Sequence, residues 1–363
     1  MAGKVEARAQ AERLLTAFRA AGAVPVEADI LQPAEVLLDL YGEDIRSRAY
    51  VTRDPLRGEM MLRPDFTVPV VRMHMEEGAE PARYCYLGEV FRKQEHRSGR
   101  PAEFLQVGYE IFDRVDPVAA DAEVFALFAE LLSPLDLRAA TGDIGILMAA
   151  VKGLTTTDRR KAALLRHIWR PARFRALLER FGGLAPVPPA RAALIAQLAS
   201  GEVPESGAPQ IGLRSPEEIA DRLSALAEDA AAPPIAAEEV ALLDDILDLR
   251  APAPQALDRL RKIADELPPI RPAVERLAAR LDALAALGVE VETLDFEASH
   301  GRTTLEYYDG FVFSFHAAQE GLPPVASGGR YDALTAVLGQ GKSIPAVGGV
   351  VRPALVAELG GIG

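Results

Sequence analysis

Two strand-like segments, residues 84–92 and 104–112, carry polar side chains suited to binding a small charged molecule. Both are rich in aromatic and β-branched residues, and the polar stretch between them contains glycine and proline, so they predict an antiparallel hairpin with a long loop. Side chains alternate between the two faces of a strand. Arg92, Gln106 and Glu110 therefore lie around Gly88 and Gly108, and a guanidinium, an amide and a carboxylate together suit a zwitterion.

A third segment, residues 304–315, repeats this pattern. Alternation along a strand puts Glu306, Tyr308 and Gly310 on one face, again with a glycine that leaves room above the sheet. A polar face on an antiparallel sheet is also normal where the sheet only meets solvent. Because three strands share the pattern, we favour the floor of a small-ligand site over a solvated face.

The rest of the chain must supply the elements that position this floor. Apolar residues at helical spacing predict helices over 4–21, 35–41, 67–75 and 331–338. Further strands are expected at 26–31, 289–296, 326–330 and 346–351. Residues from about 145 to 288 are rich in Ala, Leu and Arg and have helical spacing throughout. We therefore expect an α+β fold in which residues 1–144 and 289–363 form one antiparallel sheet flanked by helices, with 145–288 as a helical insertion.

Composition limits the class of protein. The chain has 363 residues, is 49% hydrophobic and has a net charge of -13, which is typical of a globular protein and weakly disfavours a nucleic-acid partner. Its single cysteine, Cys85, excludes a disulfide within the chain. The five histidines are scattered, so we expect no metal site. No apolar run is long enough for a membrane span, and we expect a cytoplasmic protein.

Four motifs occur in an order that resembles the class II aminoacyl-tRNA synthetases, and the histidyl enzyme most closely. The hairpin, from Phe-Arg at 91–92 to residue 112, resembles the second signature motif of that class. Leu-Arg-Pro-Asp-Phe-Thr at 62–67, Leu-Glu-Tyr-Tyr-Asp-Gly at 305–310 and Gly-Gly-Arg-Tyr-Asp-Ala-Leu at 328–334 resemble motifs of the histidyl enzyme. The resemblance implies a class II synthetase-like fold and a pocket for histidine.

The resemblance also implies a role for each residue of that pocket. Three of them would hold the α-amino end of histidine: Asp65, Thr67 and Gln106. Glu110 and Tyr308 would bracket the imidazole nitrogens, and Tyr331 would line the side of the ring. Arg92 would face the carboxylate.

The sequence departs from the histidyl enzymes where adenylate chemistry needs cations. Thr303 stands where the family has an arginine, with Arg302 one residue away, and Leu355 stands where the third motif has another. Gln94 replaces the glutamate that usually reads adenine. Loss of one such cation typically costs about 10²–10³ in rate, so we expect no catalytic residues and no cofactor. Asp29 replaces the proline of the first motif, which normally builds a dimer.

The chain stops about ten residues after the third motif, so we expect no C-terminal anticodon-binding domain and no tRNA binding. A synthetase core with the amino-acid pocket but without these parts resembles the regulatory subunits of short-form ATP phosphoribosyltransferase. That resemblance implies a homodimer that binds a separate catalytic subunit, helps to activate it, and makes it sensitive to feedback inhibition by L-histidine in histidine biosynthesis.

Two alternatives remain open at this stage. One is a compact class II ligase that activates an amino acid with ATP, using Arg92, Arg100 and Arg352. The other is an amino-acid sensor with a different partner. ATP–pyrophosphate exchange distinguishes the first alternative from a regulatory subunit, and co-purification with a catalytic chain distinguishes the second.

Overall fold

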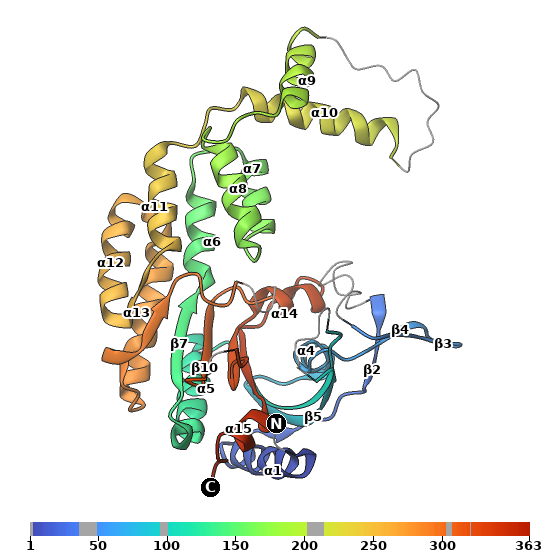
Figure 1. Ribbon diagram of the computed structural model, residues 1–363, viewed down its shortest axis with the longest axis vertical. Coiled ribbons are helices and arrows are strands. Elements are labelled where there is room, and N and C mark those ends of the chain that lie inside the picture. The colour runs from blue at the N-terminus through green and yellow to red at the C-terminus, as the bar shows by residue number, and fades with distance from the viewer. Residues whose placement is uncertain (1–2, 36–48, 95–100, 202–213, 303–306, 320) are drawn as a thin grey trace.

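A nine-stranded sheet forms the centre of the computed structural model, which describes residues 3–35, 49–94, 101–201, 214–302, 307–319 and 321–363. The strand order is β1-β5-β6-β12-β11-β10-β7-β9-β8 (Figure 1). The strands are β1 (Val24–Pro25), β5 (Ala82–Phe91), β6 (Glu103–Phe112), β7 (Arg138–Asp143), β8 (Arg250–Pro252), β9 (Asp295–Glu297), β10 (Phe311–His316), β11 (Ala326–Arg330) and β12 (Ala346–Val351). Pairing is antiparallel except at β1–β5 and β7–β9, so the predicted α+β sheet is confirmed.

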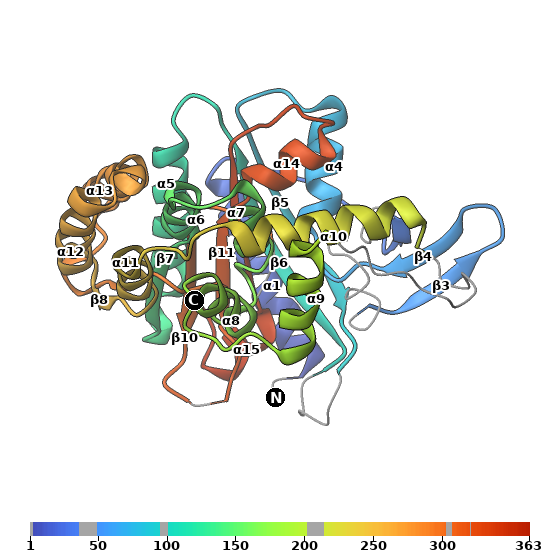
Figure 2. The same ribbon diagram turned by 90° about the horizontal axis from the view of Figure 1, so that it is seen from above.

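The predicted hairpin is confirmed as β5 and β6, with Gly88 opposite Gln106 and Tyr86 opposite Gly108. One face of β6 is apolar core, where the ring of Tyr109 lies 5.3 Å from that of Phe18. The helices on this side are α1 (Lys4–Ala20), α5 (Pro117–Leu132) and α15 (Pro353–Glu358). The other face carries Gln106 and lies under α4 (Thr67–Glu77) and α14 (Asp332–Leu338), which contact each other (Figure 2). The polar face of the hairpin is therefore covered, not solvated.

A second, three-stranded sheet lies beside this core. Its strands are β2 (Leu31–Pro33), β3 (Val51–Asp54) and β4 (Gly58–Leu62), in the order β2-β4-β3. The strand expected at 26–31 is wrong in extent: residues 26–30 are in no strand, β1 ends before them, and only Leu31 of this range belongs to β2. The helix expected at 35–41 lies outside the described residues apart from its first residue.

Residues 145–288 are mostly helical, as expected, with one exception. The helices are α6 (Ile144–Gly153), α7 (Asp158–Arg166), α8 (Pro171–Phe181), α9 (Pro189–Ala199), α10 (Pro216–Ala231), α11 (Ala237–Leu247), α12 (Ala253–Glu266) and α13 (Arg271–Ala286). The exception is β8, which pairs with β9 at the edge of the large sheet. Figure 1 shows α9 and α10 at the end of the molecule farthest from α1.

A buried ionic network joins α13 to the sheet. Arg280 of α13 donates to Asp121 of α5 at 2.9 Å and to Asp143 at the end of β7 at 3.0 Å. Arg330 of β11 donates to the other oxygen of Asp121 at 2.7 Å and to Asp332 at 3.0 Å. Because Arg330 precedes Tyr331 in the chain, this network reaches the wall of the predicted pocket.

Two strand predictions near the C-terminal half are wrong in extent. Residues 291–293 form a short 3₁₀ turn, and only Asp295–Glu297 pair as β9. The strand expected at 304–315 begins only at Phe311. Asp309 accepts hydrogen bonds from the backbone N–H groups of Asp332 and Ala333, at 3.0 and 2.7 Å, and so turns the chain toward the start of α14. The alternation assumed for Tyr308 and Gly310 therefore does not apply, and Glu306 lies outside the described residues.

Candidate functional site

A small cavity of about 10 Å³ lies between the hairpin, β12 and the segment before β10. Its walls are formed by Asp65, Thr67, Arg92, Gln106, Tyr307, Tyr308, Tyr331, Gly348, Gly349 and Val350. The structure thus brings together every residue predicted for the site except Glu110, which lies directly behind the wall. The space admits about one water molecule, so the site is closed in this conformation.

Glu110 is fully buried and accepts three hydroxyl hydrogen bonds. The donors are Tyr331 at 2.6 Å, Tyr86 at 2.8 Å and Thr67 at 3.2 Å. Burial raises the pKa of Glu110 to about 7, although the three donors lower it. Its carboxylate lies over Gly348 of β12, where a Cβ would overlap the carboxylate oxygen. The glycine therefore makes room for a carboxyl group that can change its protonation near neutral pH.

Gln106 has no hydrogen-bond partner within the part of the chain that the structure describes. Its side chain is fully buried and lines the cavity, and neither Oε1 nor Nε2 is bonded. A buried polar group without a partner typically costs about 1–3 kcal/mol. An amide both donates and accepts, so a ligand with ammonium and carboxylate groups would satisfy it.

Asp65 and Arg92 bring opposite charges to the cavity wall. Asp65 is buried just before α4, and its Oδ1 lies 3.5 Å from the backbone nitrogen of Val68. The guanidinium of Arg92 donates through Nε to the backbone carbonyl of Pro64 at 2.8 Å. Because Pro64 directly precedes Asp65, this bond holds the guanidinium near the Asp65 backbone. A carboxylate and a guanidinium in one closed site match the two charges of an amino acid.

The segment before β10 closes the site with two tyrosines. Tyr307 donates through its hydroxyl to Thr67 at 3.4 Å, and its ring meets that of Tyr308 edge to face at 4.8 Å. Burial raises the pKa of the Tyr308 hydroxyl, and Glu110 raises it further because its negative charge would repel a tyrosinate. The backbone carbonyl of Tyr308 accepts from the indole of Trp169, between α7 and α8, at 3.2 Å. The helical part of the chain therefore contacts the wall of the site.

Sequence reasoning missed five residues of the site: Tyr86, Tyr307, Gly348, Gly349 and Val350. Tyr86 lies opposite Gly108, and a Cβ on that glycine would overlap the Tyr86 ring. The sequence contained a signal for Tyr86, because the hairpin register places this tyrosine opposite a glycine, where its ring has room to lie over the sheet. Tyr307 had no such signal, because an extended strand would have pointed it away from Tyr308.

Of the cations considered for adenylate chemistry, Arg92 lines the cavity, while the others bond to different parts of the chain or lie outside the described residues. Arg302 is buried, donates to the carbonyl of Ile168 at 2.6 Å and lies 5.0 Å above the ring of Phe174. Arg352 donates to the carbonyl of Pro324. Thr303 and Arg100 lie outside the described residues. Arg302 therefore faces the helical part of the chain.

The other substituted positions lie on the surface or in packing. Leu355 is a partly buried residue of α15 that packs against the core. Gln94 is exposed and donates to the carbonyl of Arg92 at 3.3 Å. Asp29 is exposed, and its carbonyl accepts from Gln32 at 2.7 Å.

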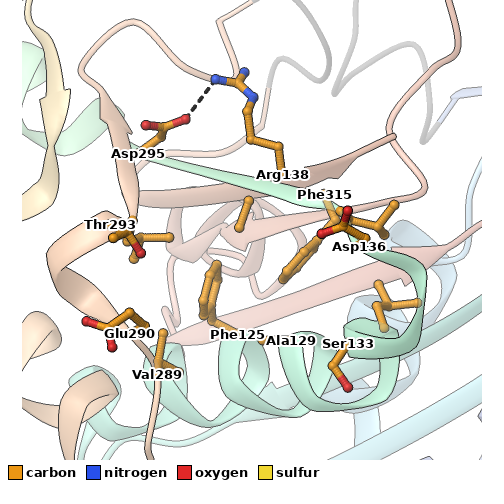
Figure 3. Close-up of a pocket in the computed structure, with 14 residues that line it drawn as sticks. Phe125, Ala129, Ser133, Asp136, Arg138, Val289, Glu290, Thr293, Asp295 and Phe315 are labelled. Atoms are coloured by element: carbon orange, nitrogen blue, oxygen red, sulfur yellow. Dashed lines mark hydrogen bonds and ion pairs between the residues drawn. The ribbon is translucent and has the colours of Figure 1, made fainter. Parts of the chain in front are cut away.

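A larger hollow of about 380 Å³ lies elsewhere, between α5 and the turn that precedes β9. Figure 3 shows Phe125 and Phe315 along its floor and Arg138 on its rim, paired with Asp295 at 2.8 Å. It shares no residue with the closed cavity. We do not take it as the candidate site despite its larger volume, because the charge of Arg138 on its rim is already neutralised by Asp295.

The described ranges contain neither a metal-binding cluster nor a membrane-spanning helix. No group of three or more His, Cys, Asp or Glu side chains in them could hold a metal ion. No helix in them has the length and apolar character needed to cross a membrane.

Comparisons with known proteins show the family of the chain. The histidyl-tRNA synthetase family model matches residues 4–250 and 217–355. An ATP phosphoribosyltransferase regulatory subunit of Brucella anthropi is 34% identical over 89% of this chain and 89% of its own, and one of Brucella abortus is equally similar.

Solved structures share the fold. A Bacillus halodurans protein described as an ATP phosphoribosyltransferase regulatory subunit/histidyl-tRNA synthetase has a TM-score of 0.67 at 21% identity, over 98% of this chain and 79% of its own. The histidyl-tRNA synthetase of Nostoc sp. PCC 7120 has a TM-score of 0.63 at 18% identity, over 98% of this chain and 72% of its own. The chain has the class II synthetase-like fold and belongs to the family of ATP phosphoribosyltransferase regulatory subunits.

Proposed function

We propose that this chain is a non-catalytic regulatory subunit that binds L-histidine in the closed cavity and transmits its presence to a separate ATP phosphoribosyltransferase catalytic subunit. The single observation that carries the proposal is Gln106, a buried amide with no partner in the described chain and with its side chain in the wall of a polar cavity. A group left in this state is stabilised when a ligand arrives.

Each part of histidine has a partner in this site. The α-ammonium group would meet Asp65, Thr67 and the carbonyl oxygen of Gln106, and the carboxylate would meet Arg92. The imidazole would meet Glu110 and Tyr308 beside the ring of Tyr331. Free imidazole titrates near pH 6.5 and Glu110 near 7, so a proton is readily shared between them.

Binding requires the site to open, because about 10 Å³ does not hold an imidazole ring. We expect the segment with Tyr307 and Tyr308 to move, since the other wall residues lie in strands of the sheet, directly beside a strand end, or at the start of α4. Movement of this segment would pull on Trp169 and on Arg302, which donates to Ile168. Histidine would then favour one arrangement of the helical part, which is the differential binding that allostery requires.

We also propose a domain organisation and an assembly for this chain. Residues 145–288 form the insertion in a core of residues 1–144 and 289–363, and the chain acts as a cytoplasmic homodimer in complex with the catalytic subunit, with no tRNA ligand. Within that complex the subunit supports activity and confers inhibition by histidine. A compact ATP-dependent ligase is the second candidate, and the orientation of Arg302 toward Ile168 disfavours it.

Calorimetry with L-histidine and the purified chain tests the binding step. Wild type should bind, and Glu110→Ala should abolish binding because the imidazole loses its charged partner. Glu89→Ala, on the same hairpin but paired with Arg8 at 2.8 Å, is the matched control and should bind normally. Unchanged affinity in Glu110→Ala refutes the pocket. Histidine-dependent ATP–pyrophosphate exchange by the chain alone refutes the non-catalytic assignment.

The regulatory step needs the catalytic subunit. The purified catalytic chain should gain activity on addition of this protein, and histidine should inhibit the mixture. Inhibition should be lost with Glu110→Ala while co-purification is retained. Failure of the two chains to co-purify would leave a histidine sensor with another partner, and would overturn the assignment of the partner.

A further inference from the structure

Five arginines line a hollow of about 210 Å³ in the helical part of the chain, far from the histidine cavity in the fold. They come from four helices: Arg159 and Arg160 from α7, Arg180 from α8, Arg191 from α9 and Arg222 from α10. Figure 1 shows α9 and α10 at one end of the molecule, with α7 and α8 directly below them. Convergence of one residue type from four helices makes this a surface built by the tertiary structure.

One lining carboxylate, Asp229, faces these guanidinium groups. It accepts from Arg160 at 2.6 Å and from Arg191 at 2.8 Å, and Arg180 lies 3.7 Å away. Arg159 lies 3.6 Å from a second acid, Glu228. Within the described chain no carboxylate pairs with Arg222. Positive charge is thus in excess here, although the whole chain carries a net charge of -13.

The excess charge is unfavourable in the absence of a ligand. Burial lowers the pKa of Arg180, the neighbouring Arg191 and Arg160 lower it further, and Asp229 only partly opposes this. Removing the charge of the buried Arg160 from water is costly without full compensation, whereas the side chains of Arg159 and Arg180 are 59% and 40% exposed and can meet an anion from solvent. An anion in the hollow would supply the missing negative charge.

Two of the guanidinium groups are also held in place by an aromatic ring. Phe181 lies 4.5 Å from the guanidinium of Arg180 and 5.2 Å from that of Arg160. Arg160 is further fixed by its bonds to the carbonyls of Pro233 and Asp229, both at 2.7 Å. Because Nε, Nη1 and Nη2 of Arg160 all donate to protein oxygens, Arg160 braces the hollow. The guanidinium of Arg180, held by the ring of Phe181, is the one that suits bonds to phosphate oxygens.

We propose that the hollow lined by Arg159, Arg160, Arg180, Arg191 and Arg222 binds a compact phosphate-bearing anion. Its volume is below the range of about 300–1,000 Å³ usual for drug-sized ligands, which favours a phosphate or pyrophosphate group over a whole nucleotide. The site does not depend on histidine binding.

Calorimetry with inorganic pyrophosphate, in histidine-free buffer, tests the site on the full chain. Wild type should bind saturably, more tightly than acetate and more weakly as salt rises. Arg180→Gln combined with Arg222→Gln should weaken binding at least tenfold, because two charge-assisted contacts are lost. Arg261→Gln on α12 is the matched control, since Arg261 is half-exposed and lies 3.7 Å from Asp258. It should leave affinity unchanged.

Arg160 is not used as a test position because it fixes the end of α10, and circular dichroism should show equal melting for the double variant and wild type. The proposal is overturned by absence of saturable pyrophosphate binding, by equal loss in the Arg261 control, or by acetate binding as tightly. Tight binding of an RNA duplex without binding of pyrophosphate would also overturn it and would indicate a nucleic-acid surface.

Discussion

Trp169 donates its indole N–H to the backbone carbonyl of Tyr308 at 3.2 Å, so the helical part of the chain and the wall of the cavity are joined by a direct bond. A second bond lies nearby, from Arg302 to the carbonyl of Ile168 at 2.6 Å. Both connect the segment before β10 with the turn between α7 and α8. A ligand that displaces Tyr308 must therefore change this contact.

Trp169 is the only tryptophan in the chain, so its fluorescence should report occupancy of the cavity. Histidine should shift its emission, because opening of the site moves the carbonyl that the indole contacts. Trp169→Phe removes one hydrogen bond worth about 0.5–1.5 kcal/mol and should change histidine affinity about two- to tenfold by calorimetry. An emission spectrum that does not respond to saturating histidine would contradict this coupling.

Gln106→Met should stabilise the protein and abolish histidine binding together. The substitution removes a buried amide with no partner in the described chain, which releases about 1–3 kcal/mol, while the ligand loses its donor and acceptor. Thermal melting and calorimetry measure the two effects. Gln10→Met is the control, because Gln10 is also buried but accepts from the N–H of Ile362 at 2.9 Å, and it should destabilise. Destabilisation by both substitutions would show that Gln106 is satisfied in solution.

Glu110 should make the protein less stable as pH rises from about 4.5 to about 7. Its folded pKa of about 7 is above the usual 4.5, so the folded state holds a proton that the unfolded state has released. The free energy of unfolding then falls with pH across this window and is constant above it. At about 1.4 kcal/mol per pKa unit, the loss is roughly 3 kcal/mol. Asp309, also raised to about 7 by burial, adds a loss of the same sign.

Urea unfolding of wild type and Glu110→Gln at pH 5 and pH 8 checks this linkage. The variant mimics the protonated carboxyl, so its stability relative to wild type should grow by up to roughly 3 kcal/mol between the two pH values. Glu76→Gln should show no such growth, since the Glu76 side chain is 69% exposed. If the difference in free energy of unfolding between Glu110→Gln and wild type were the same at both pH values, the Glu110 carboxyl would be ionised throughout the range.

Arg280→Met should destabilise the protein by about 3–5 kcal/mol, because it leaves Asp143 and one oxygen of Asp121 buried without a cation. Asp143→Asn in the same chain should recover part of the loss, since an amide still caps Gly145 and carries no charge. Chemical unfolding measures both. Equal instability of the single and double variants would show that packing by Arg280, and not charge, is responsible.

The sequence allowed prediction of the hairpin, α4 and the residues of the cavity because these depend on local alternation and spacing. Gln106 and Glu110 lie on one strand, Asp65 lies just before α4 and Thr67 begins it, so each position follows from its neighbours. The family motifs then placed these elements in one site. The residue-level face assignment of β6 holds, with Val107 and Tyr109 buried on the core side.

Features that depend on distant partners were not predictable. The strand expected through Tyr308 fails because Asp309 bonds to the start of α14, more than twenty residues further along the chain. The partners of Arg280 are chosen among residues over a hundred positions away, and nothing in the local pattern distinguishes it from the exposed arginines of the same helix. Likewise, that Gln106 has no partner among the described residues depends on the packing of the core.

The small volume of the cavity would limit the speed of the proposed response to histidine. A ligand cannot enter a space that admits about one water, so association must wait for the segment with Tyr307 and Tyr308 to move aside. The association rate should then level off as histidine concentration increases. Changes in histidine concentration shorter than the lifetime of the closed state would then have no effect. The catalytic partner would respond to the concentration averaged over that lifetime.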